Sequence, residues 1–223
     1  MNKPMSLFVI LLLMSSTLFS AEPYKALFID GIPKTLTFEN GKFTGTMGNY
    51  LKCVLQNAEI ETSHQPAQIN DLLDQLALGK IDFATAIVQT TERDSYATAT
   101  DPLINLDAML LSQRPMKLHQ IAGEVVAVAR GSSYARKISD MGARITYAES
   151  YLDALHMLME SKVTAAVIPR SLVTTNDIPD VEKLFSTSFT RDKIVFYVSK
   201  RAQHSDKLVS ALNKGINACH TKN

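Results

Sequence analysis

An arginine that follows a polar turn, Thr90-Thr91-Glu92-Arg93, is the first group in this sequence that suits ligand binding. The turn comes after the apolar run Phe83–Val88, which predicts a strand buried on both faces. Backbone N–H and C=O groups are free at a strand end, and a planar guanidinium matches a carboxylate with two parallel hydrogen bonds. The alternative is a surface ion pair between Arg93 and Glu92, Asp94 or Asp101.

A second segment, residues 128–134, has the same character. It reads as a strand end, a turn at Gly131, and two hydroxyls, Ser132 and Ser133, that open a helix. Backbone amides at the start of a helix attract anions. Helix capping by the serine hydroxyls is the alternative.

Motifs for catalysis are absent from the sequence. It contains no G-x-S-x-G, S-x-x-K or H-E-x-x-H motif and no glycine-rich phosphate loop, and its five histidines are scattered singly. The 23 basic and 22 acidic residues give a formal charge of +1, without the basic stripe that a nucleic-acid binder needs. We therefore expect no enzyme activity, no metal, no cofactor and no nucleic-acid partner.

The two candidate segments must be positioned by alternating strands and helices. We expect strands at 24–30, 36–38, 42–44, 59–62, 83–88, 107–111, 124–129, 144–148, 164–168 and 194–198. Helices are expected at 46–58, 151–159, 169–175 and 205–219, with one more over the apolar residues 69–76 that Gly79 ends. Asn40-Gly41 predicts a hairpin turn. This order favours an α/β fold with mainly parallel sheets.

One pattern occurs twice. Residues 72–84 and 154–166 both read as a helix, a lysine, a β-branched residue, a short polar residue and an apolar strand, 82 positions apart. The spacing indicates two lobes of similar build, and a cleft between such lobes suits a small ligand.

Residues 1–20 have the layout of a secretory signal peptide. Lys3 precedes an apolar run at 7–13, and small or polar residues follow at 15–17 and at 20. A membrane anchor or a buried N-terminal strand is the alternative. Removal of Lys3 leaves 22 basic and 22 acidic side chains, so the mature chain is formally neutral.

Export also bears on the two cysteines, Cys53 and Cys219. An exported chain reaches an oxidising compartment, which favours a disulfide over two buried free thiols.

Taken together, these segments resemble the family 3 solute-binding proteins, the periplasmic amino-acid receptors of ABC transporters. The resemblance covers nearly all of the mature chain. It is carried by Gly41-Lys42-Phe43-Thr44-Gly45, by residues 76–82, by Thr90-Thr91-Glu92-Arg93 with Asp101-Pro102, and by residues 126–133.

The resemblance implies a type II two-lobed periplasmic binding protein-like fold with a central cleft, in a periplasmic monomer. Lobe one would comprise 22–104 and 190–223, and lobe two 107–187. The ligand would be a small carboxylate or an amino acid. The partner would be the membrane permease of an ABC transporter or a membrane sensor. The terminal helix would return to lobe one, which makes the Cys53–Cys219 bridge plausible.

Roles for individual residues follow from the same resemblance. Arg93 matches the arginine that clamps the ligand's α-carboxylate, and Ser133 with Ser132 matches the donors of lobe two. Thr85, Ala86 and Val88 match the strand end that supplies backbone contacts. Asp30 matches an acidic residue of the cleft.

Two positions depart from the family pattern. Pro169 stands where an aspartate often pairs with the ligand's α-ammonium, and Ile69 where an aromatic residue often stacks on the ligand. Either another acid such as Asp30 substitutes, or the ligand lacks an α-amino group. Two alternatives remain. One is a periplasmic module that serves a membrane sensor, either by sensing a ligand or as an interaction module whose pocket is degenerate. The other is a dehydratase of the same fold, and Pro169 removes one acid that a dehydratase would use.

Overall fold

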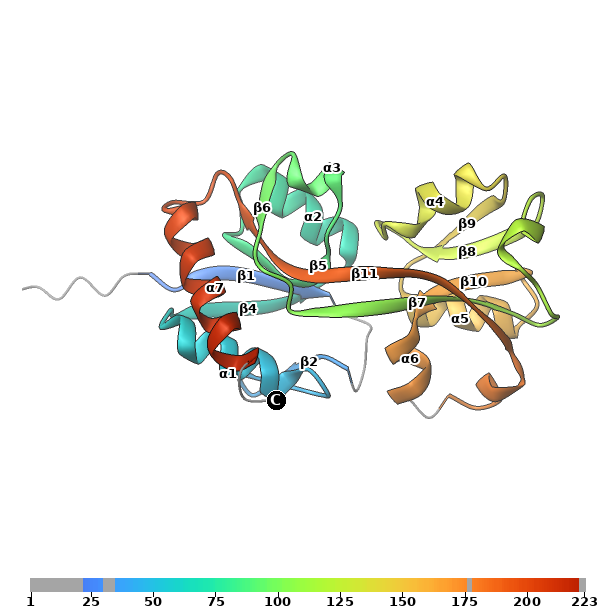
Figure 1. The fold of residues 1–223 in the computed structure, drawn as a ribbon, viewed down its shortest axis with the longest axis horizontal. Coiled ribbons are helices and arrows are strands. Elements are labelled where there is room, and N and C mark those ends of the chain that lie inside the picture. Colours follow the sequence, from blue (N-terminus) through green and yellow to red (C-terminus); the bar gives the residue numbers. More distant parts are fainter. Residues whose placement is uncertain (1–21, 30–34, 176–177, 221–223) are drawn as a thin grey trace, which may run out of the picture.

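A computed structural model describes residues 22–29, 35–175 and 178–220 of the chain. Figure 1 shows two lobes of helices around strands, connected by two long strands that run side by side. The predicted signal segment, 1–20, lies outside the described residues, as does Asp30. The two-lobed α/β fold expected from the sequence is confirmed.

The elements of the first lobe come from both ends of the chain. They are β1 (Tyr24–Ile29), β2 (Thr37–Glu39), β3 (Lys42–Thr44), α1 (Gly48–Ala58), β4 (Thr62–Ala67), α2 (Ile69–Leu78), β5 (Phe83–Val88), α3 (Thr91–Asp94), β6 (Ala97–Ala99) and α7 (Ser205–His220). The second lobe holds β8 (Val125–Ala129), α4 (Tyr134–Asp140), β9 (Arg144–Ala148), α5 (Tyr151–Met159), β10 (Ala165–Pro169) and α6 (Arg170–Thr175). Two short 3-10 turns, Leu118–Gln120 and Val181–Lys183, lie between β7 and β11 along the chain.

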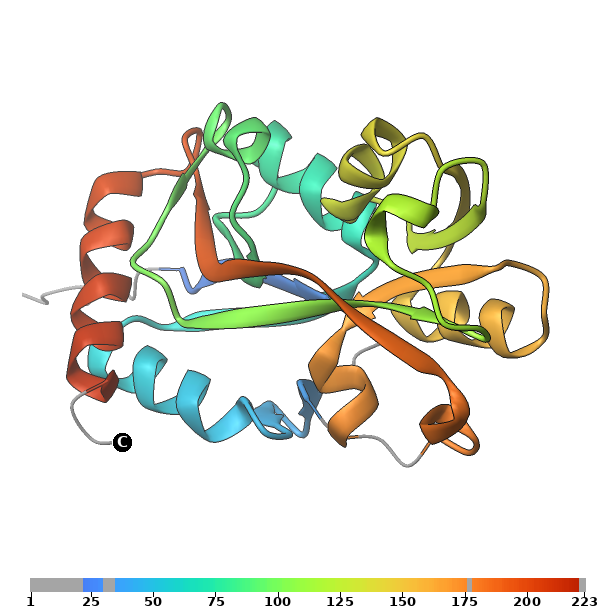
Figure 2. The ribbon, with the colours of Figure 1, turned by 45° about the vertical axis from the view of Figure 1, so that its right-hand side comes forward.

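The long strands β7 (Ile104–Ser112) and β11 (Phe185–Ser199) join the lobes into one sheet. The strand order is β4-β1-β5-β11-β7-β10-β8-β9, and β6 also pairs with β11. Pairing is parallel among β4, β1 and β5 and among β10, β8 and β9, while every pair that includes β7 or β11 is antiparallel. The parallel sheets expected from the sequence are therefore confined to the lobes, and the sheet as a whole is mixed. Figure 2, turned by 45°, shows β7 and β11 still side by side between the lobes.

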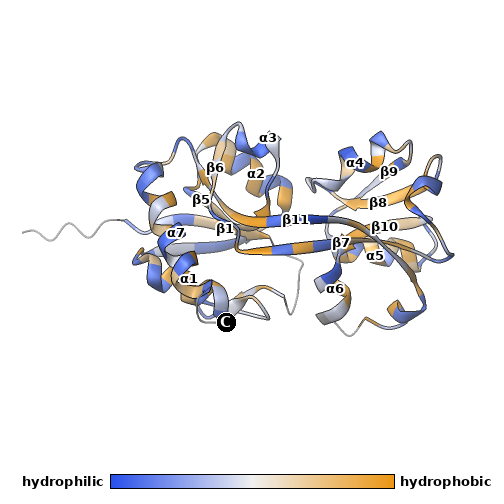
Figure 3. Cartoon of the chain, viewed as in Figure 1, coloured by the Kyte–Doolittle hydropathy of each residue, from blue (hydrophilic) through white to orange (hydrophobic). Residues whose placement is uncertain are grey.

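Two apolar cores support this arrangement. One lies within the first lobe, where Phe28, Phe83 and Phe196 pack with Leu212 of α7. The other runs from α2 through β7 into the second lobe, and includes Leu72, Leu110 and Leu155. Figure 3 colours β11 hydrophobic where it enters the first lobe and hydrophilic where it crosses to the second. The crossing strands are thus anchored at their buried ends, with polar residues between.

Most predicted elements have the expected position, and two strands do not. The strand expected at 59–62 lies at Thr62–Ala67, because Glu59 adopts a left-handed φ of 56° that ends α1 and delays the strand. Pro66 is tolerated there because β4 is an edge strand. The strand expected at 194–198 begins at Phe185, since its polar first half is paired with β7 rather than buried.

The internal repeat is visible in the backbone. Helix α2 leads to β5, as α5 leads to β10, and both helices are followed by a residue with positive φ: Gly79 at 71° and Ser161 at 59°. Those two residues occupy equivalent positions in the two copies of the repeated pattern, 82 residues apart.

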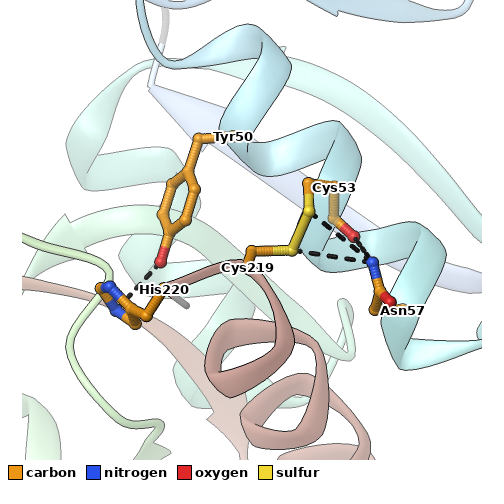
Figure 4. The surroundings of a disulfide bond; sticks show 5 residues. All are labelled: Tyr50, Cys53, Asn57, Cys219 and His220. Atoms are coloured by element: carbon orange, nitrogen blue, oxygen red, sulfur yellow. Dashed lines mark hydrogen bonds between the residues drawn. A yellow bond between two sulfur atoms is a disulfide. The ribbon is translucent and has the colours of Figure 1, made fainter. Parts of the chain in front are cut away.

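A disulfide joins Cys53 of α1 to Cys219 of α7, with 6.1 Å between their Cα atoms, so this prediction is confirmed. Asn57 donates from Nδ2 to the Cys53 carbonyl at 2.9 Å, and Tyr50 is hydrogen-bonded to His220 at 3.0 Å (Figure 4). A Cβ on Gly215 would lie 2.2 Å from the carbonyl oxygen of Val54, so the two helices approach too closely for any other residue there.

Loss of the disulfide is expected to destabilise the protein strongly. It closes a loop of 166 residues, so replacing both cysteines with alanine should lower the free energy of unfolding by about 5 kcal/mol on the chain-entropy model. Urea unfolding with and without reductant measures this loss, and reductant should not affect the double variant. Two thiols reacting in denatured, unreduced protein would contradict the bridge.

His64 makes stability depend on pH. Its side chain is 9% exposed on β4, its ring lies 4.6 Å from that of Phe43, and burial lowers its pKa to about 4. The unfolded chain, with a histidine pKa near 6.5, binds the proton first as pH falls. The stability present above pH 6.5 is therefore lost toward pH 4, by about 3 kcal/mol.

Comparing wild type with His64→Leu from pH 7 to pH 4 isolates this effect. The difference in unfolding free energy between the two should change by about 3 kcal/mol. The same substitution at the exposed His156 is the control and should leave the pH dependence of wild type unchanged. A parallel pH profile for His64→Leu and wild type would refute the assignment.

Candidate functional site

A cavity of about 590 Å³ lies between the two lobes. The first lobe lines it with the end of β5 and the turn that carries Arg93, and the second lobe with the segment between β8 and α4. Asp192 of β11 lines it from the crossing strands. The lining residues used below are Val88, Thr90, Arg93, Gly131, Ser132, Ser133 and Asp192. Such a volume suits a small metabolite.

Arg93 connects the two lobes directly. Its side chain is buried, with 6% exposure, and Nη1 donates to the Val88 carbonyl at 2.6 Å. Nη2 donates to the Gly131 carbonyl of the second lobe at 3.0 Å. In the described part of the chain, no ion pair joins Arg93 to Glu92, Asp94 or Asp101. The guanidinium therefore faces the lobe boundary, not the outer surface.

The turn that carries Arg93 is held from β11. Thr90 caps α3 by accepting a hydrogen bond from the Arg93 N–H at 3.2 Å. The Tyr197 hydroxyl donates to Asp94 at 2.6 Å and accepts from the Thr90 N–H at 3.1 Å. Burial, and then the hydrogen bond to Asp94, raise the pKa of Tyr197, so it stays a neutral donor. Lys200 adds a bond from Nζ to the Asp94 carbonyl at 2.7 Å.

The second-lobe segment is a tight turn after β8. Gly131 has a φ of 76°, and the Ser132 N–H donates back to the Ala129 carbonyl at 3.0 Å. Ser133 occupies the N-cap of α4, but its side chain makes no capping hydrogen bond. The Ser132 Oγ is buried and has no partner among the described residues. Helix capping thus does not occupy the two hydroxyls.

The structure brings together four of the residues singled out from sequence: Val88, Arg93, Ser132 and Ser133 all line the cavity. Thr85 and Ala86 do not line it but lie further back in β5. The Thr85 Oγ1 is buried without a partner in the described part of the chain. Ala86 has a φ of 57° beside a register shift against β11, a strained conformation that functional sites often contain.

The two positions that depart from the expected pattern are both buried. Ile69 begins α2, and its Cγ2 would lie 3.1 Å from a Cβ placed on Gly131, so it faces the second lobe. Pro169 ends β10 opposite Ala108. Neither side chain carries a charge.

Sequence reasoning missed three polar residues near the cavity: Asp192, Tyr134 and Tyr151. The pKa of Tyr151 is raised to about 12, mainly by burial, with Arg93 opposing the rise and Asp192 adding to it. Burial raises the pKa of Tyr134 as well, with contributions from Tyr151 and Asp192. These residues lie on α4, α5 and β11, so no local motif could reveal that they meet.

Other site types find no support in the part of the chain that the structure describes. Within 22–29, 35–175 and 178–220, no three His, Cys, Asp or Glu side chains gather as a metal site would require. Over the same ranges, no helix has the length and apolar character to cross a membrane.

Comparisons with known proteins agree with the two-lobed fold. A profile of the bacterial extracellular solute-binding proteins, family 3, matches residues 29–223. No curated protein sequence matches the chain significantly.

Solved structures share the fold at low sequence identity. An ancestral arginine-binding protein bound to glutamine has a TM-score of 0.76 at 18% identity, over 89% of this chain and 92% of that one. The GLUR0 ligand-binding core in complex with L-glutamate has a TM-score of 0.73 at 18% identity, over 91% and 95%. The BvgS VFT2 domain of Bordetella pertussis, a double mutant, has a TM-score of 0.73 at 16% identity, over 87% of each chain.

The contact at Gly131 predicts how the lobes respond to mutation. In Gly131→Ala the new Cβ would lie 3.0 Å from the backbone N and 3.2 Å from the Cα of Asn70, so these neighbours across the lobe boundary must give by a few tenths of an ångström. Urea unfolding should therefore show a larger loss of stability than the strain of a left-handed alanine alone produces.

Gly123→Ala is the matched control. Gly123 has a φ of 77° and belongs to the same lobe, but a Cβ there would meet no described atom within 4 Å. It carries the strain of a left-handed alanine, on the order of 1 kcal/mol, without the contact between lobes. Equal losses of stability in both variants would show that the contact between Gly131 and Asn70 does not constrain the boundary between the lobes.

Proposed function

Since the chain belongs to the bacterial extracellular solute-binding proteins of family 3, we propose that it captures a small carboxylate-bearing solute, an amino acid or a related metabolite, between its lobes. The observation that carries the proposal is the buried Arg93 guanidinium, which lines the cavity and reaches both lobes. A buried cation in a cavity of this size is suited to a small anionic group.

Arg93 acts by exchanging one partner for another. A ligand carboxylate replaces the Gly131 carbonyl as the acceptor for Nη2, while Nη1 keeps its bond to Val88. The exchange is favourable because a carboxylate accepts a stronger hydrogen bond from a guanidinium than a neutral carbonyl does. Ser132 and Ser133 then offer hydroxyl and amide donors from the second lobe.

Capture is reported to a membrane partner by a change in lobe position. The lobes, 22–104 with 190–223 and 107–187, move about the crossing strands β7 and β11, and the ligand shifts the population toward the closed form. The partner that recognises this form is the permease of an ABC importer, and the site of action is the periplasm. No chemical step is required of the protein.

Two other functions are compatible with the same fold, and experiments would distinguish them from solute capture for import. A membrane sensor in place of a permease would leave uptake of the ligand unchanged in cells that lack this protein. A dehydratase would consume its ligand, so loss of a cyclic acid on prolonged incubation would replace the proposal of simple capture.

The first test is a ligand screen with Arg93→Ala. Wild type should be stabilised by about 2.7 kcal/mol at a hundredfold excess of a true ligand over its dissociation constant, detected by thermal shift across amino acids and small carboxylic acids. Arg93→Ala should lose this stabilisation, because Arg93 is the only buried cation among the residues that the structure describes.

Arg130→Ala is the matched control. Arg130 lies one residue before Gly131 but forms an exposed ion pair with Glu149 at 3.3 Å, 46% exposed on the arginine side. The affinity of Arg130→Ala for the ligand should stay within about twofold of the wild-type affinity, because an exposed ion pair contributes little. Unchanged affinity in Arg93→Ala would remove the carboxylate clamp, and no shift with any acid or amino acid would overturn solute capture.

A further inference from the structure

Tyr147 is an exposed aromatic residue that lines the cavity between the lobes. It is the last residue but one of β9, and it is 47% exposed. Among the described residues only two other large apolar side chains, Leu78 and Phe185, are similarly exposed, and neither lines this cavity. A single apolar residue on a surface needs no function. Tyr147 differs because it shares its cavity with the buried cation of Arg93.

One face of the Tyr147 ring already has a partner. The guanidinium carbon of Arg130 lies over the ring, 5.4 Å from its centroid, which is a cation–π geometry. Arg130 also pairs with Glu149 at 3.3 Å. A ligand therefore has the opposite face and the edge of the Tyr147 ring to contact.

The space beside Tyr147 extends the cavity that Arg93 lines. A second cavity of about 390 Å³ shares seven lining residues with the first, and Tyr147 is one of them. Ile145 lines this extension from two residues earlier on β9, which places it on the same face of the strand as Tyr147. The two cavities together therefore leave room for an apolar group that projects away from the guanidinium.

The first lobe adds two more apolar walls. Leu73 of α2 and Tyr96, which follows α3, both line the cavity. The Tyr96 N–H donates to the Arg93 carbonyl at 3.2 Å. Burial raises the pKa of Tyr96 and the charge of Arg93 opposes the rise. The cavity thus combines one buried cation with an aromatic ring from each lobe.

Asp192 also lines the cavity, but its carboxylate has partners within the protein. Its Oδ1 lies 3.2 Å from the Thr190 hydroxyl and 3.4 Å from Lys137 Nζ, and its Oδ2 is buried. Asp192 therefore sets no requirement for a second charged group on the ligand. The aromatic walls are what can distinguish one carboxylate from another.

We propose that the cavity selects carboxylates that carry an aromatic ring, with the carboxylate at Arg93 and the ring in contact with Tyr147. This inference rests on the proposed function and names the class of its ligand. Two aromatic rings in offset or edge-to-face contact attract each other beyond the effect of burial. Tyr147 therefore determines specificity through the ring, while Arg93 binds the group that all such ligands share.

The test compares each aromatic acid with its cyclohexyl analogue. Isothermal titration uses benzoate with cyclohexanecarboxylate, 3-phenylpropionate with 3-cyclohexylpropionate, and L-phenylalanine with L-cyclohexylalanine, so that an amine is present in one pair only. The saturated ring buries at least as much apolar surface, so burial alone does not favour the aromatic member. Wild type should bind the aromatic member of at least one pair at least about threefold more tightly.

Tyr147→Leu should remove this preference, because leucine is apolar but has no ring. Its affinity for the aromatic acid should fall at least about threefold. Its affinity for the cyclohexyl analogue should stay within about twofold, which also shows that the variant is folded. Tyr147→Phe keeps the ring and should bind both members as wild type does.

Phe185→Leu is the matched control. Phe185 is an aromatic residue of β11 with 46% exposure, and it lines neither of the two cavities. The same replacement of a ring by leucine should therefore leave the preference for aromatic acids unchanged.

The outcomes separate the two proposals. If Tyr147→Leu keeps the wild-type preference, the role of Tyr147 is overturned. If wild type binds both members of every pair equally, or binds only acids without rings, the ligand class is overturned and solute capture stands. If wild type binds no carboxylic acid and no amino acid, the proposed function itself fails.

Discussion

The buried guanidinium of Arg93 is the constraint on which the arrangement of this protein depends. A cation at 6% exposure requires acceptors, and the chain supplies one carbonyl from each lobe, at Val88 and Gly131. The Thr90 cap and the Tyr197 hydroxyl hold the arginine in place from within the first lobe. Gly131 must lack a side chain so that its carbonyl can come this close. One side chain thus connects the strand end, the second-lobe turn and the lobe separation.

Selectivity in a nearly neutral chain has to arise locally. With 23 basic and 22 acidic residues, the protein has no global field that would attract one kind of ion. The charges that matter are those that the fold removes from water at the cavity, Arg93 and Asp192. Arg93 lies on α3 and Asp192 on β11, so the first lobe and a crossing strand line the cavity together.

The sequence predicted the fold well and the site in part. Hydrophobic periodicity located β5 and α5 at their observed bounds, because burial of their apolar residues dominates their local preference. It missed the first half of β11, whose polar residues are ordered by pairing with β7. Among site residues it found Arg93 and Ser132, which stand in recognisable turns. It missed Asp192, which stands in no motif and faces the cavity only because of strand register.

What the sequence alone determined is therefore the type and order of most elements and the family, and it favoured the Cys53–Cys219 bridge that the structure contains. These follow from local pattern and composition. The tertiary structure alone decided which carbonyls accept from Arg93 and that Asp192 keeps a buried oxygen without a partner. The contact between Arg93 and Gly131 joins residues 38 positions apart, and its geometry depends on how two lobes and a shared sheet pack, which no local segment encodes.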